Sequence, residues 1–336
     1  MHDDVLISVQ NLKTFLYANG RCNRAVNDVT FEIRKGRTLC VVGESGCGKS
    51  ITAASVMQLL PELSRIEGGQ IVYQSPGGPI RIDQLAKNGK KMRALRGADL
   101  AMIFQDPMTA LNPVYTIGQQ ISENLRYHTK LKPRARRAKT ISLLAEMGIP
   151  IPEQRVDEYP HQFSGGMRQR AMIAMAMACD PHVLIADEPT TALDVTIQAQ
   201  VFELMEKLKA KHQTAVMLIT HDMGVVTELA DDVIVMYMGN IVEGGTVEEV
   251  LRTPRHPYTR ALLDSIPVLG RGKDQKIDPI QGTTPDPYER PPGCQFAPRC
   301  PRCQPLCEQA LPPEQVLGES THRLRCFFPV GGPNEA

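Results

Sequence analysis

The sequence predicts an α/β fold built on a parallel β-sheet with a phosphate-binding loop. A short apolar segment rich in β-branched residues, at 38–42, is followed by a glycine-rich loop and then by a helical pattern at 51–60. Two more apolar segments, at 183–186 and 216–220, enclose a helical pattern at 197–209. Strands that alternate with helices in this way form parallel sheets.

The rest of the chain indicates additions to this core, as a length of 336 residues suggests. Alternating segments at 5–9 and 29–33 predict an antiparallel N-terminal β subdomain. The stretch from about 107 to 180 predicts an inserted α-helical subdomain. Pro and Gly become frequent after residue 252, so we expect a main domain at 1–252 and a loop-rich C-terminal extension at 253–336.

The composition argues against several classes of protein. A formal net charge of +1 predicts no bulk attraction to nucleic acid or to an anionic membrane, so we expect no nucleic-acid partner. The start of the chain, Met1-His2-Asp3-Asp4, lacks the apolar run of a secretory signal. No stretch approaches the ~20 apolar residues that a membrane-spanning helix needs. We therefore expect a soluble protein whose role at any membrane comes through a partner.

The glycine-rich loop fits the pattern Gly-x4-Gly-Lys-Ser in full. Its glycines allow consecutive backbone N–H groups to face phosphate oxygens, and the positive end of the following helix faces the same anion. Lys49 is expected to neutralise the β- and γ-phosphates, and Ser50 to offer its hydroxyl to Mg²⁺. Cys47 is better explained as a small residue than as a redox switch. The expected nucleotide-binding residues here are Gly43, Glu44, Ser45, Gly46, Cys47, Gly48, Lys49, Ser50 and Ile51.

Two carboxylates end the predicted strand at 183–186. Asp187 is expected to bind Mg²⁺, directly or through water, and Glu188 to polarise the water that attacks the γ-phosphate. Many buried strands end in an acid, so this pattern is weak alone. Its position in the same predicted sheet as the loop strengthens it.

A second helix N-terminus is expected after Phe163, at Ser164, Gly165 and Gly166, where amides can hold a γ-phosphate. This segment resembles the signature motif of ATP-binding-cassette (ABC) ATPases, whose common form is Leu-Ser-Gly-Gly-Gln. Phe163 and Met167 depart from that form. In that family two ATPases pair head to tail, and each signature closes over the partner's ATP. The resemblance therefore implies an ABC-type P-loop ATPase with a shared site.

The same resemblance implies further site residues. Gln105 matches the glutamine that senses Mg²⁺ and the attacking water, the segment Ala192-Leu193-Asp194 matches the loop that crosses the dimer interface, and His221 matches the histidine that contacts the γ-phosphate. An aromatic ring near the N-terminus should stack on adenine, and Phe15 and Tyr17 both qualify. The implied catalytic residues are Lys49, Gln105, Glu188 and His221, and the implied Mg²⁺ ligands are Ser50, Gln105 and Asp187.

Longer segments, at 105–113, 159–167, 187–194 and 253–259, resemble the oligopeptide/dipeptide importer branch of this family. The resemblance implies the ATP-hydrolysing subunit of a bacterial importer for dipeptides or oligopeptides. It also implies a second, related but different ATPase subunit, two membrane permease subunits and an extracytoplasmic solute-binding protein. The chain would then be peripheral, on the cytoplasmic face of the inner membrane. The alternatives are an importer ATPase for nickel or a sugar, and a soluble ABC ATPase acting on nucleic acid.

Five of the nine cysteines crowd into the C-terminal extension, which in a cytosolic chain favours metal over disulfides. Four thiolates suit either a [4Fe-4S] cluster or a structural Zn²⁺. In the importer branch four such cysteines hold a [4Fe-4S] cluster. The resemblance therefore implies the cluster, with Zn²⁺ as the alternative, on Cys294, Cys300, Cys307 and Cys326. Cys303 is an additional thiol in this segment.

Overall fold

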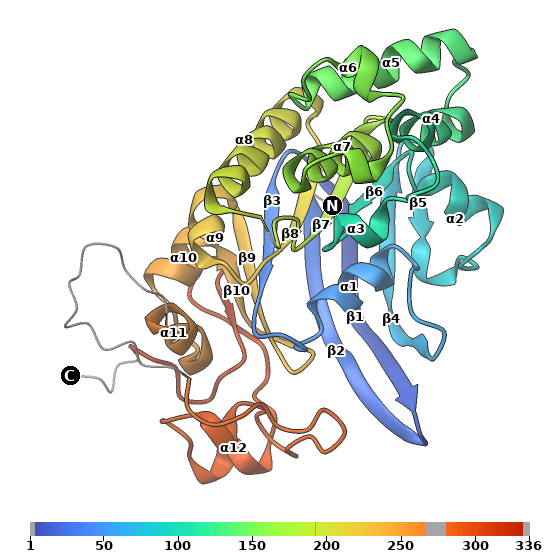
Figure 1. Cartoon of the computed structure of the whole chain (residues 1–336). Coiled ribbons are helices and arrows are strands. Elements are labelled where there is room, and N and C mark those ends of the chain that lie inside the picture. The colour runs from blue at the N-terminus through green and yellow to red at the C-terminus, as the bar shows by residue number, and fades with distance from the viewer. Residues whose placement is uncertain (1–3, 192, 266–279, 332–336) are drawn as a thin grey trace. The chain divides into compact units, whose positions relative to one another are not determined.

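The computed structural model (Figure 1) describes residues 4–191, 193–265 and 280–331. The chain divides into two compact units. The first unit comprises Met1–Ile7, Ile33–Arg37 and Tyr73–Ile219. The second comprises Ser8–Glu32, Thr38–Val72 and Thr220–Ala336. The chain passes between the units several times, and most of the first unit is one long insertion into the second.

Three parallel strands form a sheet in the first unit: β6 (Leu100–Ile103), β7 (Val183–Asp187) and β8 (Ala215–Ile219). The central strand, β7, pairs with β6 on one side and β8 on the other. Every residue of β7 and β8 is buried, as a parallel sheet covered on both faces requires. The predicted α/β class with a parallel sheet is confirmed.

Helices make up most of the remaining first unit. α4 (Ile117–His128), α5 (Pro133–Glu146) and α7 (Gly165–Met177) pack on one another and gather in green tones in Figure 1. α8 (Val195–His212) follows β7. Thr116 and Gln119 begin α4 with a reciprocal capping box. The smaller elements are β5 (Gly78–Arg81), η1 (Ile82–Gln84), α2 (Lys90–Leu95), α3 (Pro107–Ala110), α6 (Pro152–Arg155) and η2 (Pro160–Gln162). These helices confirm the inserted helical subdomain.

Long antiparallel strands form one sheet of the second unit: β1 (Val5–Ala18), β2 (Arg21–Arg34) and β4 (Ser64–Ser75), with β1 in the middle. Asn19 and Gly20, both at positive φ, form the tight β1–β2 turn. The Tyr17 N–H donates to Leu63 O at 2.8 Å, and Asn11 lies against Gly69, so β4 runs antiparallel to β1. The antiparallel N-terminal subdomain is confirmed.

A second sheet of this unit begins with β3 (Thr38–Val42), which pairs in parallel with β9 (Asp232–Tyr237). β10 (Asn240–Thr246) continues it antiparallel to β9, followed by β12 (Arg323–Leu324) and β11 (Gln315–Val316). The C-terminal extension is thus joined to β10 by strand pairing. The helices of this unit are α1 (Lys49–Val56), α9 (Met223–Leu229), α10 (Val247–Arg252), α11 (Pro257–Asp264), η3 (Ala297–Arg299) and α12 (Pro305–Gln309).

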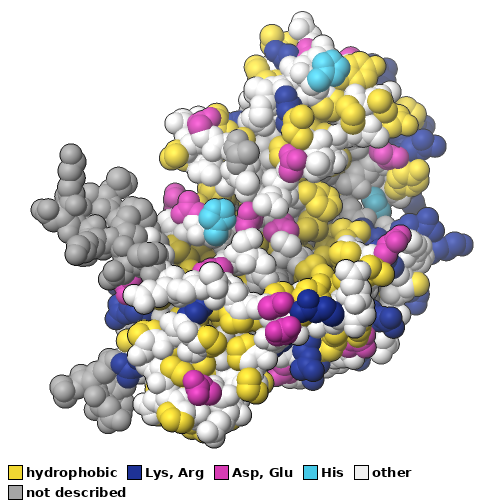
Figure 2. All heavy atoms as spheres, turned by 60° about the horizontal axis from the view of Figure 1, so that its bottom comes forward, with side chains coloured by type: hydrophobic (Ala, Val, Ile, Leu, Met, Phe, Trp, Pro, Cys, Tyr) yellow, Lys and Arg dark blue, Asp and Glu magenta, His cyan; other side chains and the backbone are white. Residues whose placement is uncertain are grey.

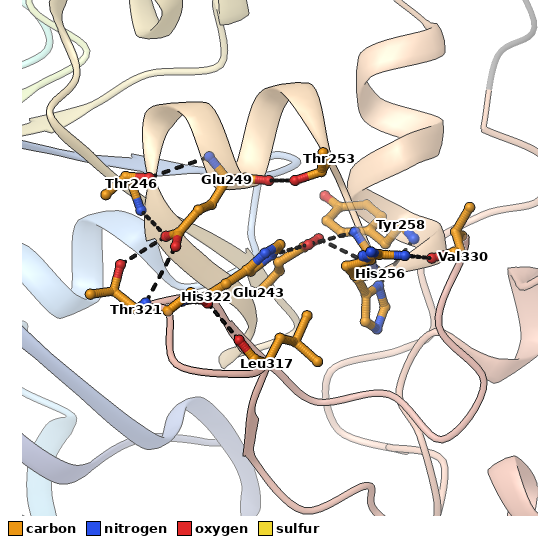
Figure 3. A network of polar contacts seen from close by, with 12 residues as sticks. Glu243, Thr246, Glu249, Thr253, His256, Tyr258, Leu317, Thr321, His322 and Val330 are labelled. Carbon is orange, nitrogen blue, oxygen red and sulfur yellow. Dashed lines mark hydrogen bonds and ion pairs between the residues drawn. The ribbon is translucent and has the colours of Figure 1, made fainter. Parts of the chain in front are cut away.

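A fully buried carboxylate, Glu243 of β10, organises the C-terminal part of the second unit (Figure 3). It accepts hydrogen bonds from the backbone N–H groups of Arg255 at 2.6 Å and His256 at 3.0 Å, and His322 Nε2 lies 2.7 Å from its Oε1. A buried charge is tolerated only with such partners. One side chain therefore fixes β10, the start of α11 and the segment before β12 to each other.

His256 is buried next to this carboxylate and caps α11. Its Nδ1 accepts a hydrogen bond from the Tyr258 N–H at 3.0 Å, and its Nε2 has no hydrogen-bond partner among the described residues. Burial lowers the pKa of His256 from 6.5 to about 4. The imidazole is therefore neutral at neutral pH.

This lowered pKa predicts a loss of stability in acid. Between pH 6.5 and about 4 the unfolded chain binds more protons at this position than the folded chain does, so the His256 contribution is complete above pH 6.5 and falls as the pH drops toward 4. Between pH 7.5 and pH 5 it should reduce the free energy of unfolding by about 2 kcal/mol. The measurement is urea denaturation followed by circular dichroism. His256→Asn, which keeps a capping oxygen but does not titrate, should lose about 2 kcal/mol less over this interval. Equal losses in both proteins would contradict the assignment.

Candidate functional site

The phosphate-binding loop connects β3 to α1 and contains two glycines that have no room for a side chain. Gly43 has φ 148°, and a Cβ there would lie 2.2 Å from Met236 O. Gly48 has φ 108°, and a Cβ there would lie 2.1 Å from Ala25 O. The positive φ values and the close neighbours both require glycine. The loop is therefore held between β2 and the end of β9.

Lys49 lies inside this loop with only 5% of its surface exposed. Its ammonium donates to Gly43 O at 2.7 Å and to Glu44 O at 3.1 Å. Cys47 is buried beside it, and burial raises the pKa of the thiol, which keeps it protonated and unreactive. Ser45, Gly46 and Ser50 are exposed, and Ile51 is half-buried in α1.

This loop fits the phosphates of a nucleotide. A buried ammonium, closely packed glycines and a helix N-terminus converge on one segment of nine residues. The N-terminus of α1 begins at this loop, and the N-terminus of a helix attracts an anion. Ser50 supplies a hydroxyl of the kind that binds Mg²⁺ beside such phosphates.

The structure brings Gln105 and Glu188 together in the first unit. Gln105 follows β6 and Glu188 follows β7, and these strands are parallel neighbours, so their carboxyl ends meet. The Gln105 side-chain N–H donates to Glu188 Oε2 at 2.9 Å. Thr191 Oγ1 donates to the same oxygen at 3.2 Å, a contact that the sequence did not indicate.

Glu188 has φ 45°, a left-handed conformation that costs a residue with a side chain about 1–3 kcal/mol. Its N–H donates to Ile219 O at 3.0 Å and holds the residue in that conformation. Strain of this kind is concentrated at functional sites. Asp187, the last residue of β7, is 7% exposed. The carboxyl end of β7 thus carries two adjacent carboxylates, and hydrogen bonding holds the backbone of Glu188 in place.

The other site residues predicted from the resemblance lie at helix starts and strand ends. Ser164 is exposed and caps α7, since its hydroxyl accepts from the Met167 N–H at 3.3 Å, and Gly165 and Gly166 form the first turn. Asp194 caps α8 by accepting from the Ile197 N–H at 3.0 Å, and Ala192 lies outside the described residues. His221 is exposed and follows β8.

The two candidate adenine-stacking rings differ in their contacts. Arg24 lies over the ring of Phe15 at 5.8 Å, and Arg65 lies over the ring of Tyr17 at 5.0 Å. Tyr17 also donates its hydroxyl to Glu67 at 2.6 Å, and this hydrogen bond raises its pKa to about 12. Tyr17 is therefore held by two side chains of β4, Arg65 and Glu67.

The expectation of a metal on Cys294, Cys300, Cys307 and Cys326 is wrong, for the [4Fe-4S] cluster and for Zn²⁺. Across residues 4–191, 193–265 and 280–331, no three His, Cys, Asp or Glu side chains are grouped so that they could hold a metal ion. The four cysteines line one cavity together with Phe296, Phe327 and Phe328. Burial raises the pKa of Cys300 to about 11 and that of Cys326 to about 12, so these thiols are protonated at neutral pH.

Comparison with known proteins agrees with this geometry. A family model described as ABC transporter matches residues 26–191, and one described as the oligopeptide/dipeptide transporter C-terminal region matches residues 242–307. A dipeptide transport ATP-binding protein of Bacillus subtilis (strain 168) is 48% identical over 324 residues, 96% of this chain and 94% of that protein. A dipeptide transport ATP-binding protein of Haemophilus influenzae is 46% identical over 315 residues, 93% of each chain.

Solved structures are similar as well. A cassette described as part of an ABC transporter complex in Clostridium perfringens matches with a TM-score of 0.62 and 26% identity, over 75% of this chain and 92% of that one. An ATP-binding cassette solved as a dimer in a post-hydrolysis state with ADP and Pi matches with a TM-score of 0.64 over 72% of this chain and 99% of that one. At 22% identity, the second likeness concerns the fold alone.

The crowding at Gly48 predicts the effect of one methyl group. Gly48→Ala should weaken ATP affinity by about tenfold or more, because the Cβ displaces the loop from Ala25 O. Gly20→Ala is the matched control, since Gly20 also has positive φ but nothing within 4 Å of its Cβ position. It should leave affinity unchanged and lower only stability. Titration with a fluorescent ATP analogue measures the affinity of each variant. Equal affinities of Gly48→Ala and Gly20→Ala would refute the steric explanation.

Proposed function

The chain belongs to the ABC transporter family, as its 48% identity along nearly the whole length of a transport ATP-binding protein shows, and we propose that it is the ATP-hydrolysing subunit of an importer for dipeptides or oligopeptides. Relatives named for dipeptide and oligopeptide transport match along the chain, and the matched C-terminal region is named for the same substrates. The structural observation that carries the proposal is the hydrogen bond between Gln105 and Glu188 at the ends of neighbouring parallel strands.

In the proposed reaction the loop holds the phosphates of ATP, and Lys49 neutralises their charge. Ser50, Asp187 and Gln105 would hold Mg²⁺, which supplies further charge neutralisation when bound. Glu188 orients the attacking water and accepts its proton. The Gln105 amide and the Thr191 hydroxyl hold the Glu188 carboxylate in place, and the fixed left-handed backbone limits its movement. His221 would contact the γ-phosphate.

The proposed site is shared between two ATPase subunits. Ser164 and Gly165 are exposed at the start of α7, where their amides can reach a phosphate on another chain. ATPases of this family dimerise, and closure on ATP followed by opening after hydrolysis would supply the motion for transport. We propose a related but different chain as the second subunit, and Phe15 as the ring that stacks on adenine.

The membrane part of the transporter belongs to other subunits. Within the described residues, no helix has both the length and the apolar character to cross a membrane. Large apolar side chains are exposed just after β6, at Met108, Val114 and Tyr115, and these would contact the permease subunits. An extracytoplasmic solute-binding protein would deliver the peptide, and the chain would lie on the cytoplasmic face of the inner membrane. We assign ATP hydrolysis to 1–252 and retain 253–336 as the extension.

A nucleic-acid partner finds no support on the surface in view. Figure 2 shows Lys and Arg side chains interspersed with Asp and Glu on the face that it displays, and the formal net charge is +1. Binding to a phosphate backbone needs a continuous basic surface.

The role of Glu188 predicts a specific kinetic defect. In the assembled transporter, Glu188→Gln should lower kcat for ATP by about 100-fold or more, because an amide cannot accept the proton, while ATP binding persists. Glu203→Gln on the exposed face of α8 removes a carboxylate that pairs with Lys207, away from the site residues, and should leave kcat unchanged. Normal turnover by Glu188→Gln would refute the assigned role.

The substrate class is tested with the transporter reconstituted in proteoliposomes together with its binding protein. A dipeptide or tetrapeptide should stimulate ATP hydrolysis and accumulate inside the vesicles, whereas nickel and sugars should do neither. Stimulation by nickel or a sugar instead of by peptides would overturn the peptide assignment and leave the ATPase assignment in place.

A further inference from the structure

The phosphate-binding loop is held by residues of the C-terminal segment that follows β10. Glu44, the second residue of the loop, is contacted on its side chain by Arg299 and on its backbone by Tyr258. Both lie more than 200 residues further along the chain and in the same compact unit. We propose that Arg299 and Tyr258 are positioning residues that hold the loop in its nucleotide-binding conformation, so that ATP affinity depends on this segment. The inference assumes the proposed nucleotide site.

The contact between Arg299 and Glu44 is a bidentate ion pair. Arg299 Nη1 lies 2.7 Å from Glu44 Oε2, and Nη2 lies 3.0 Å from Oε1. The Arg299 side chain is 4% exposed, so little water screens the pair. Its Nε donates to Gln281 O at 3.0 Å, which fixes the plane of the guanidinium. The hydrogen bond to Glu44 raises the pKa of Arg299 above its usual range, so the cation is permanent.

Tyr258 holds a peptide group of the loop. The N–H of Glu44 donates to Tyr258 Oη at 2.8 Å, and the carbonyl of the same peptide group, Gly43 O, accepts from Lys49 Nζ at 2.7 Å. Both polar atoms of this peptide are therefore engaged, one by the C-terminal segment and one by the phosphate-binding lysine. Rotation of the peptide would break both bonds, and Lys49 would lose its first carbonyl partner.

Tyr258 is itself rigidly placed. It is fully buried, its N–H donates to His256 Nδ1, and the start of α11 is fixed by Glu243 (Figure 3). Its ring packs against Tyr237 at 4.6 Å and Phe296 at 5.3 Å between centroids. Phe296 precedes η3, the turn that ends at Arg299, so the two positioning residues share one packed cluster. The cluster connects the cysteine-rich turn to the loop.

The test compares conservative variants in the assembled transporter. Tyr258→Phe removes one hydroxyl and should raise KM for ATP about fivefold, since a single hydrogen bond is lost. Arg299→Gln should raise KM about tenfold or more. Arg299→Lys should raise KM less than Arg299→Gln does but still above the unmodified value, because an ammonium cannot form the two parallel hydrogen bonds of the guanidinium. In each variant kcat should stay within about twofold, because no reacting group has changed.

Two further variants distinguish loss of the positioning contact from a general loss of stability. Arg325→Gln removes a similar ion pair of the same segment, to Asp28 at 3.0 Å, that does not touch the loop, and it should leave KM unchanged. Glu44→Gln combined with Arg299→Gln should be no worse than Arg299→Gln alone, because the pair acts as a unit. Unchanged KM in both Tyr258→Phe and Arg299→Gln would overturn the inference. Failure of the unmodified protein to bind ATP would instead overturn the proposed function.

Discussion

The absence of side chains at Gly43 and Gly48 is the constraint on which the site depends. Both glycines lie closer to backbone carbonyls than any Cβ permits, and those carbonyls belong to β9 and β2. The β9–β10 turn adds a hydrogen bond from the Gly239 N–H to Cys47 O at 2.8 Å. The loop is therefore shaped from outside by β2, which precedes it in the chain, and by β9, which follows it much later. A glycine-rich segment alone would be flexible, and these neighbours make it a fixed anion site.

The C-terminal segment is part of this support. Glu243 is buried in β10 and gathers the start of α11 and the segment before β12 through three contacts. The start of α11 then places Tyr258, whose ring packs on Phe296 next to the turn that contains Arg299. A buried carboxylate is a costly way to join segments, because losing one partner leaves an uncompensated charge. Its hydrogen bonds are directional, however, so each bond fixes an orientation that apolar packing would leave open.

Sequence patterns predicted the parts of the fold that rest on local rules. The buried strands β3, β7 and β8 are continuous apolar runs, and the loop motif has fixed spacing. The predicted helix at 51–60 in fact ends at Val56, because Gln58 adopts φ 52°, and nothing in its side chain announces this. β4 was missed because Gly68 and Gly69 lie in its middle, and a pair of glycines is typical of a turn or loop. Fold class and family were thus accessible from the sequence.

What escaped prediction depends on contacts across long stretches of chain or on the local dielectric. The bond from Arg299 to Glu44 joins residues 255 positions apart, and no periodicity marks either of them. The cysteine spacing matched a metal-binding pattern, but spacing carries no information on burial. Burial holds the Cys300 and Cys326 thiols in their neutral form, and their neighbours include phenylalanine rings.

The distance along the chain between the loop and its supports also orders events during synthesis. Residues 43–50 leave the ribosome early, whereas the strand β9 beside the loop, Tyr258 and Arg299 follow much later. At roughly 5–20 residues per second, the 255 residues between Glu44 and Arg299 take about 10 to 50 s to make. For that period the loop has β2 beside it but lacks the contact with Arg299. A nascent chain should therefore gain its full ability to bind nucleotide only after Arg299 has been made, which delays ATP consumption until the supports of the loop exist.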